Sequence, residues 1–178
     1  MRDRRPLRGS IWASAVWTGA LWAGAILAGA IGVLVPQRDL AAQQAAPLQT
    51  FAMETLAIES GGRKHVFKVE LADSPAQQSQ GLMWRRAMAK DAGMLFDYRR
   101  PTQISMWMAN TYIPLDMIFI DAGGVIRRIA ERTVPLSTET IGSGEPARAV
   151  LEVNGGTAAA LGIKVGDRVL HARFGRAP

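Results

Sequence analysis

The chain has 178 residues, a formal net charge of +6 and no cysteine. The lack of cysteine excludes disulfides, thiolate nucleophiles, cysteine-ligated zinc and a lipid anchor on an N-terminal cysteine. Half of the positive excess belongs to residues 1–42, and the rest is interspersed with acidic residues over 43–178. We therefore predict no nucleic-acid partner, because no basic patch interleaved with aromatic residues tracks a phosphate backbone.

Residues 1–42 have the pattern of a signal peptide or a membrane anchor. Arginines dominate the first eight residues, and an uncharged stretch follows from residue 11 to residue 35. As a helix, this stretch would be roughly 37 Å long, which is enough to span a bilayer. The excess of positive charge before it predicts a cytoplasmic N-terminus and places residues 43–178 on the other side of the membrane.

Two outcomes remain open for this segment. Its length favours a retained anchor, because the apolar part of a signal peptide is shorter. Pro36 followed by Leu40-Ala41-Ala42 favours cleavage near Ala42, and the sequence leans slightly toward cleavage. In both cases we expect a periplasmic or extracytoplasmic protein, secreted or tethered by the N-terminal helix, with an envelope or membrane component as its partner.

The rest of the chain predicts a linker and first strand region over 43–62 and a single mainly-β domain over 63–176. Short strands between Gly and Pro turns are predicted over 51–59, 65–71, 94–98, 104–108, 115–120, 125–131, 149–153 and 168–174. Side chains alternate between two faces over 65–71 and 104–108, whereas 94–98 is a short apolar run. Short helices are predicted over 75–81 and 157–161. The fold class that follows is a sandwich or barrel with one or two short helices, preceded by the N-terminal apolar helix.

Four motifs carry a family resemblance: GLMWR at 81–85, DAGMLF at 91–96, WMANTYIPLDMIFID at 107–121, and VLEVNGG with LGIKVGD within 150–167. Over residues 65–174 the chain resembles the family of domains of unknown function 192. The resemblance implies a compact jelly-roll-like β fold, often exported in bacteria, without an established activity. The motif positions are Gly81, Met83, Arg85, Gly93, Met94, Phe96, Trp107, Met108, Asn110, Pro114, Asp116, Glu152 and Gly166.

One position departs from the family pattern. The pattern usually has a lysine between the Trp-Met and Asn-Thr pairs, and this chain has Ala109 there. Any role that the resemblance implies for that lysine is therefore absent from this protein.

The candidate ligand-binding residues are Arg85, Trp107, Asn110, Asp116 and Glu152. Arg85, Trp107 and Asn110 are side chains of the polar and aromatic kind that line small-molecule pockets. This set favours a binding or accessory module over an enzyme. A hydrolase that uses Asp116 and Glu152 for acid–base chemistry is an alternative. The competing structural interpretation pairs these carboxylates with Arg85 or with backbone N–H groups.

Metal chemistry has one further alternative. His65 and His171 are the two histidines, too few for a zinc-type site, so no metal site or cofactor is predicted. A cluster of thioethers would select Cu(I), and Met106 and Met108 share one face of a predicted strand. The other members would be Met83, Met88, Met94 and Met117. The competing interpretation is that these methionines fill an irregular core.

Overall fold

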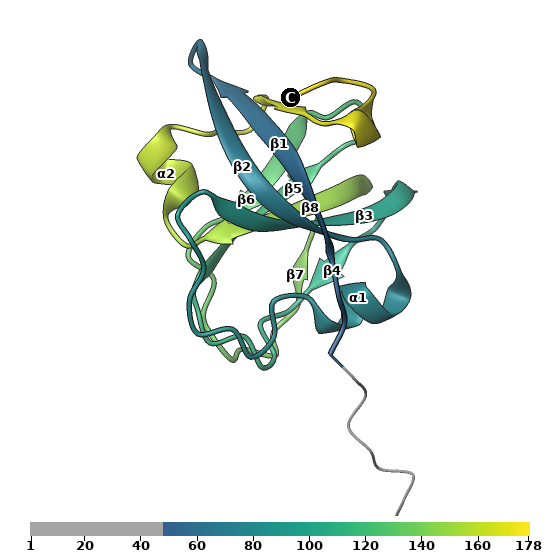
Figure 1. Cartoon of the computed structure of the whole chain (residues 1–178), viewed down its shortest axis with the longest axis vertical. Coiled ribbons are helices and arrows are strands. Elements are labelled where there is room, and N and C mark those ends of the chain that lie inside the picture. The colour runs from purple at the N-terminus through teal and green to yellow at the C-terminus, as the bar shows by residue number, and fades with distance from the viewer. Residues whose placement is uncertain (1–47) are drawn as a thin grey trace, which may run out of the picture. The chain divides into compact units, whose positions relative to one another are not determined.

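The computed structural model describes residues 48–178, so the predicted signal or anchor segment lies outside the described residues. Seven strands form one curled sheet in the order β6-β5-β8-β3-β2-β1-β9 (Figure 1). All neighbouring strands are antiparallel except β2 and β3. The bounds are β1 Ala52–Ser60, β2 Arg63–Ala72, β3 Ala92–Thr102, β5 Leu115–Ile120, β6 Ile126–Ala130, β8 Ala147–Asn154 and β9 Arg168–Leu170. A second sheet pairs β4 (Ser105–Met106) with β7 (Ile141–Gly142).

The sheet curls so far that its two edges meet. Val125, just before β6, forms an isolated bridge with Arg168 of β9. The Ile126 N–H donates to the Asp167 carbonyl at 2.9 Å, next to this bridge. The mainly-β class is thus confirmed, and its form is a curled half-barrel. Among residues 48–178, no helix is both long and apolar enough to cross a bilayer.

The two faces of the sheet carry separate apolar cores. The first core includes Leu56, Phe67, Ile118 and Leu151 and is closed by α2 (Thr157–Leu161) through Ala158. The second core lies on the opposite face, and its largest members are Leu82, Met94, Phe96, Met108, Met117 and Phe119. Alternation along each strand sends successive side chains to the two faces in turn.

The helix α1 (Pro75–Gln80) begins and ends on clear local signals. The Ser74 hydroxyl accepts a hydrogen bond from the Gln77 N–H, and the Gln77 side chain accepts one from the Ser74 N–H in return. Pro75 stands at the first helical position, where its missing N–H costs nothing. The helix ends at Gly81, whose φ is +48° and where a Cβ would lie 3.0 Å from the Phe96 ring. This glycine therefore holds the end of α1 tightly against the second core.

Two predicted strands are shorter than expected. The segment predicted over 168–174 ends as a strand at Leu170 and continues as a 3-10 helix, Ala172–Phe174, because the His171 side chain accepts the Arg173 N–H and starts a turn. The strand predicted over 104–108 is reduced to β4, because the Met108 N–H donates to the Ser137 carbonyl. That bond pulls the chain out of the sheet direction.

Candidate functional site

A row of side chains on one face of the sheet includes a buried acid. The register aligns Glu70 of β2, Met94 of β3, Glu152 of β8 and Met117 of β5. Residues paired in this way project from the same face of a sheet. Glu152 is thus flanked on both neighbouring strands by methionines of the second core.

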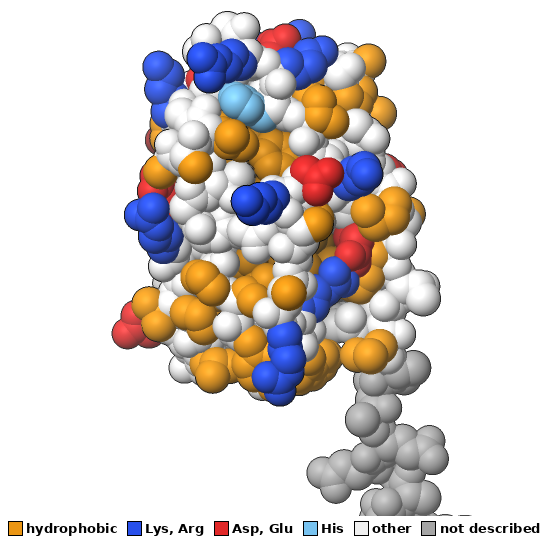
Figure 2. Space-filling view, turned by 60° about the vertical axis from the view of Figure 1, so that its left-hand side comes forward, with side chains coloured by type: hydrophobic (Ala, Val, Ile, Leu, Met, Phe, Trp, Pro, Cys, Tyr) orange, Lys and Arg blue, Asp and Glu red, His pale blue; other side chains and the backbone are white. Residues whose placement is uncertain are grey.

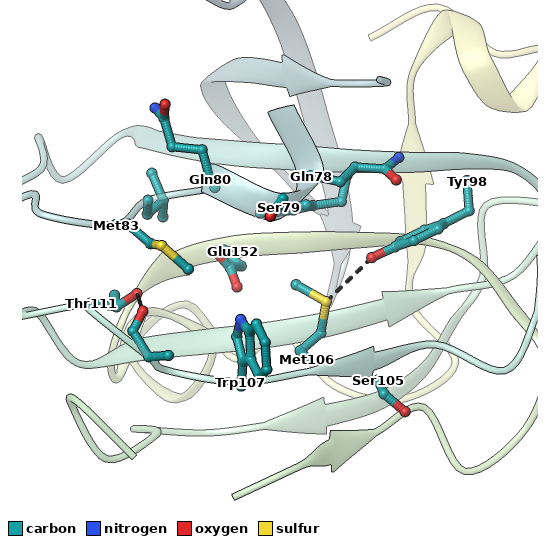
Figure 3. Close-up of a pocket in the computed structure, with 14 residues that line it drawn as sticks. Gln78, Ser79, Gln80, Met83, Tyr98, Ser105, Met106, Trp107, Thr111 and Glu152 are labelled. Carbon is teal, nitrogen blue, oxygen red and sulfur yellow. Dashed lines mark hydrogen bonds between the residues drawn. The ribbon is translucent and has the colours of Figure 1, made fainter. Parts of the chain in front are cut away.

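Glu152 lines a cavity of about 160 Å³ between α1 and the strands β3, β4 and β8 (Figure 3). In the close-up, Met83, Trp107 and Met106 surround it, and the end of α1 covers it. The lining residues are Gln78, Ser79, Gln80, Gly81, Leu82, Met83, Phe96, Tyr98, Ser105, Met106, Trp107, Ala109, Thr111 and Glu152.

Glu152 has no partner for its charge within residues 48–178. The residue is 4% exposed, and no group of the described chain donates a hydrogen bond to its carboxyl. Burial raises its pKa from 4.5 to about 8, because the charged form loses its hydration without gaining a partner. The acid is therefore mostly protonated at neutral pH when the cavity holds only water.

The cavity walls are aromatic and thioether groups. Trp107 stands at the rim and is 56% exposed, whereas Phe96 is buried. The Tyr98 hydroxyl lies 3.5 Å from the Met106 sulfur and donates to it. Burial, and then the charge of Glu152, raises the Tyr98 pKa. None of the lining residues is an arginine or a lysine, so Glu152 is the one lining residue that titrates near neutral pH, and its negative charge appears when it loses its proton.

Asp116, the second carboxylate of the predicted site, faces away from this cavity. It pairs with Val153, one step from Glu152, and so points into the opposite face of the sheet. Its oxygens accept hydrogen bonds from the backbone N–H groups of Arg132, Gly156 and Ala158, all at 2.8 Å. Asp116 therefore fixes a loop and the start of α2, and the two carboxylates do not share a site.

Arg85 and Asn110 also lie outside the cavity. Arg85 forms a bidentate ion pair with Glu70, at 2.5 and 2.6 Å, on the far side of Met94. The Asn110 carbonyl accepts a hydrogen bond from the Trp84 N–H, and both residues line a shallower neighbouring hollow. Of the five predicted residues, the structure brings Trp107 and Glu152 together.

The methionines are divided between core and cavity. Met94, Met108 and Met117 are fully buried, and Met83 and Met106 form cavity walls. Hydrogen-bond donors approach three of the sulfurs: Thr133 at Met108, Tyr98 at Met106 and Asn110 at Met83. These contacts fit core packing better than a ring of free thioethers. The histidines do not meet, because His65 is on β2 and His171 follows β9, with β1 between the two strands.

Sequence reasoning missed Tyr98 and Ala109 as cavity residues. Tyr98 follows the apolar run of β3, so nothing local distinguishes it from a core residue. Tyr112 is not among the lining residues, and its ring lies 5.2 Å from the Arg86 guanidinium. For Ala109, the sequence signal was its departure from the family pattern, which has a lysine at this position.

Known proteins match this chain through its β domain. A family model described as DUF192, Uncharacterized ACR, matches residues 56–171. A crystal structure from Sinorhizobium meliloti 1021, described as a candidate transcription regulator, is 48% identical with a TM-score of 0.69, covering 71% of this chain and 99% of that one. A protein of unknown function from Novosphingobium aromaticivorans is 38% identical with a TM-score of 0.67, covering 72% and 91%. No curated protein matches.

Proposed function

The chain belongs to the DUF192 family, whose members are described as uncharacterised, and we propose that this member is an extracytoplasmic binding module for a small organic cation of the alkylammonium type. The observation that carries the proposal is the unpaired Glu152 carboxyl at the floor of the cavity. We do not propose the role in transcription that the description of the S. meliloti relative names. Acidic and basic residues are interspersed along residues 43–178 of this chain, without the basic patch that binds nucleic acid.

A cation is the ligand that completes this site electrostatically. An ionised carboxylate buried without a partner is costly, and a positive charge within hydrogen-bonding distance offsets that cost. Because no lysine or arginine lines the cavity, the positive charge has to come from a ligand. Binding would then displace the Glu152 proton and form a short ammonium–carboxylate contact.

The walls suit an alkylammonium better than a metal ion. Trp107 and Tyr98 contribute aromatic rings to the cavity lining, and aromatic surroundings are a common device for binding organic ammonium groups. Met83 and Met106 are flexible and polarisable, so they adapt to a short alkyl chain. The volume of about 160 Å³ is close to that of a cavity that takes up benzene, which sets the ligand at about six heavy atoms.

Position 109 supports the same conclusion from the sequence side. Ala109 and Glu152 line the same cavity. A lysine at this position, as in the family pattern, would bring an ammonium group of the chain itself to the cavity. With alanine, the cavity keeps its acid and loses its internal cation, which leaves room for a cation from solution.

Binding can be followed through tryptophan fluorescence. Residues 48–178 contain two tryptophans, so Trp84→Phe leaves Trp107 at the cavity rim as the sole reporter. We expect n-butylammonium to bind, and n-butanol and butyrate to bind at least about tenfold more weakly, because only the cation pairs with Glu152. Glu152→Gln and Ala109→Lys should each abolish the preference. Glu139→Gln, the same change at an exposed site, should keep it.

The dependence on pH adds an independent check. Below the Glu152 pKa of about 8, a cation must displace a proton, so affinity should rise about tenfold per pH unit from 6 to 8 and then level off. Tyr98 is the other titratable group in the cavity wall, and its raised pKa keeps it neutral over this range. Equal affinity for n-butanol and n-butylammonium would contradict the proposal. A titration with Cu(I) that saturates a tight site would favour the thioether alternative instead.

A further inference from the structure

We propose that the domain docks on the surface of a lipid bilayer through an aromatic face formed by Trp84, Tyr112, Val134 and Leu136. The four side chains are large and apolar, and they are 49%, 41%, 68% and 55% exposed. They come from three loops, 81–91, 107–114 and 131–140. The inference goes beyond the cation site, and it rests on the extracytoplasmic location proposed above.

Backbone hydrogen bonds join these loops into one surface. The Trp84 N–H donates to the Asn110 carbonyl at 2.8 Å, and the Leu136 N–H donates to the Thr111 carbonyl at 3.1 Å. The Met108 N–H donates to the Ser137 carbonyl at 3.0 Å, on the inner side of the same loops. These hydrogen bonds therefore fix the backbones of the three loops that carry the aromatic face relative to one another.

Two of the exposed side chains are held out by strained backbone. Trp84 and Leu136 have φ of +65° and +63°, a region that bulky side chains rarely adopt. Asn110 and Arg132, from the same loops, also have positive φ, so four of the five such non-glycine residues among residues 48–178 lie here. Strain of this kind concentrates at functional sites, where the surrounding structure maintains it. Here the two strained residues carry an exposed tryptophan and an exposed leucine.

The composition of the face matches the interfacial zone of a membrane. Tryptophan and tyrosine favour the headgroup level, where the ring is buried and the polar tip stays wet. The Arg86 guanidinium lies 5.2 Å from the Tyr112 ring, so an exposed cation accompanies the aromatic group. Such cations favour anionic headgroups. In Figure 2, hydrophobic side chains gather with basic ones at the lower end of the molecule.

The chain enters the domain at the same end. The Gln49 N–H donates to the Gln80 side chain at 2.7 Å, and Gln77 donates to the Thr50 carbonyl at 2.8 Å, so the entry lies against α1 (Figure 1). Gln49, Trp84 and Asn110 line one hollow. Residues 36–47 are the only link to the uncharged stretch, and they reach at most roughly 40 Å.

The point where the chain enters the domain favours a lipid bilayer as the surface that contacts the aromatic face. A tether of that length would keep the domain close to an anchored membrane segment, and the chain enters the domain beside the aromatic face. This tether argument takes the retained anchor, one of the two outcomes that the sequence leaves open for residues 1–42.

The domain itself provides the test. The S. meliloti relative shows that a chain of little more than this domain folds, since 99% of it is covered by 71% of this chain. Residues 48–178 should co-sediment with vesicles that contain phosphatidylglycerol. In residues 48–178 with Trp107→Phe, Trp84 is the sole remaining tryptophan. On vesicle binding, its fluorescence emission should shift to shorter wavelength and should be quenched by brominated lipid.

Substitutions separate the face from general hydrophobicity. Val134→Ser combined with Leu136→Ser should weaken vesicle binding at least about tenfold, because each buried apolar side chain contributes that much. Val66→Ser is the matched control, since Val66 on β2 is 54% exposed but outside the face. Equal loss in both variants, absence of co-sedimentation, or binding without a Trp84 shift would overturn the proposal.

Two further measurements test membrane docking separately from cation binding and from the retention of residues 1–42. Glu152→Gln should leave vesicle binding unchanged while it removes cation binding, so each proposal fails on its own readout. The mass of the full chain from the membrane fraction should include residues 1–42. A mature protein that begins at Gln43 would overturn the retained anchor.

Discussion

Glu152 and Asp116 lie one register step apart on the adjacent strands β8 and β5, and their carboxyl groups point to opposite faces of the sheet. Asp116 accepts three backbone hydrogen bonds at the start of α2, whereas no donor of residues 48–178 reaches Glu152. Asp116 and Glu152, both buried acids of the family motifs, thus have different roles. One organises the fold, and the other remains available to a ligand.

The unpaired acid predicts an unusual dependence of stability on pH. Because the pKa of Glu152 is raised from 4.5 to about 8, its contribution is fully present below pH 4.5 and is lost as pH rises through 8. Glu152→Gln should therefore match the wild type at pH 5 and exceed it at pH 8, with a difference that grows by up to about 1.4 kcal/mol per pH unit. Urea unfolding at a series of pH values measures this. A constant difference would mean that the carboxyl is solvated.

Asp116 predicts a loss of stability without any effect on the cavity. Asp116→Asn replaces one acceptor oxygen by a donor, so at least one of the N–H groups of Arg132, Gly156 and Ala158 loses its partner. We expect a loss of about 2–4 kcal/mol in the free energy of unfolding, since hydrogen bonds to a buried carboxylate are among the strong ones. Asp91→Asn, at an exposed carboxylate, should change it little. A variant that stays as stable as the wild type would contradict this role.

The ion pairs of Asp97, on β3, predict that the fold loses stability in acid. Burial alone would raise the pKa of Asp97, but the Arg99 N–H and the ion pairs with Arg148 and Arg173 outweigh it and hold the pKa below 3.8. The stabilisation is present above pH 3.8 and is lost as pH falls through the lower folded value.

Asp97→Asn should therefore be less stable than the wild type by about 2–3 kcal/mol at pH 7, and the difference should shrink toward pH 2. Thermal unfolding at both pH values measures it. Glu145→Gln, at an exposed carboxylate, provides the control. A gap that stays the same at pH 2 would assign the effect to packing instead of charge.

The strain at Trp84 predicts a conflict between stability and docking. Asparagine tolerates positive φ better than tryptophan does, so Trp84→Asn should leave stability unchanged or raise it by about 1 kcal/mol. The same variant should lose vesicle binding. A clear loss of stability would show that Trp84 serves mainly as a packing residue.

The sequence by itself determined the elements whose signals are local. The bounds predicted for the apolar strand Leu115–Ile120 and for the glycine-bounded Thr157–Leu161 helix agree with the structure to the residue. Ser74 and Pro75 likewise indicate the start of α1, because a helix cap depends on residues within three positions along the chain. The four motifs also identified the family, since their order along the chain is preserved.

The tertiary structure alone decided which residues share a site. Period-two alternation sends neighbouring side chains to opposite faces, so a carboxylate's face depends on the pairing register between strands that are distant in sequence. That register separates Asp116 from Glu152, and it places Met94 between Glu152 and Glu70, the partner of Arg85. Tyr98 and Ala109 meet Glu152 only after the sheet has curled and α1 has closed over it. Whether a buried acid has a partner is a property of this packing, and no single strand encodes it.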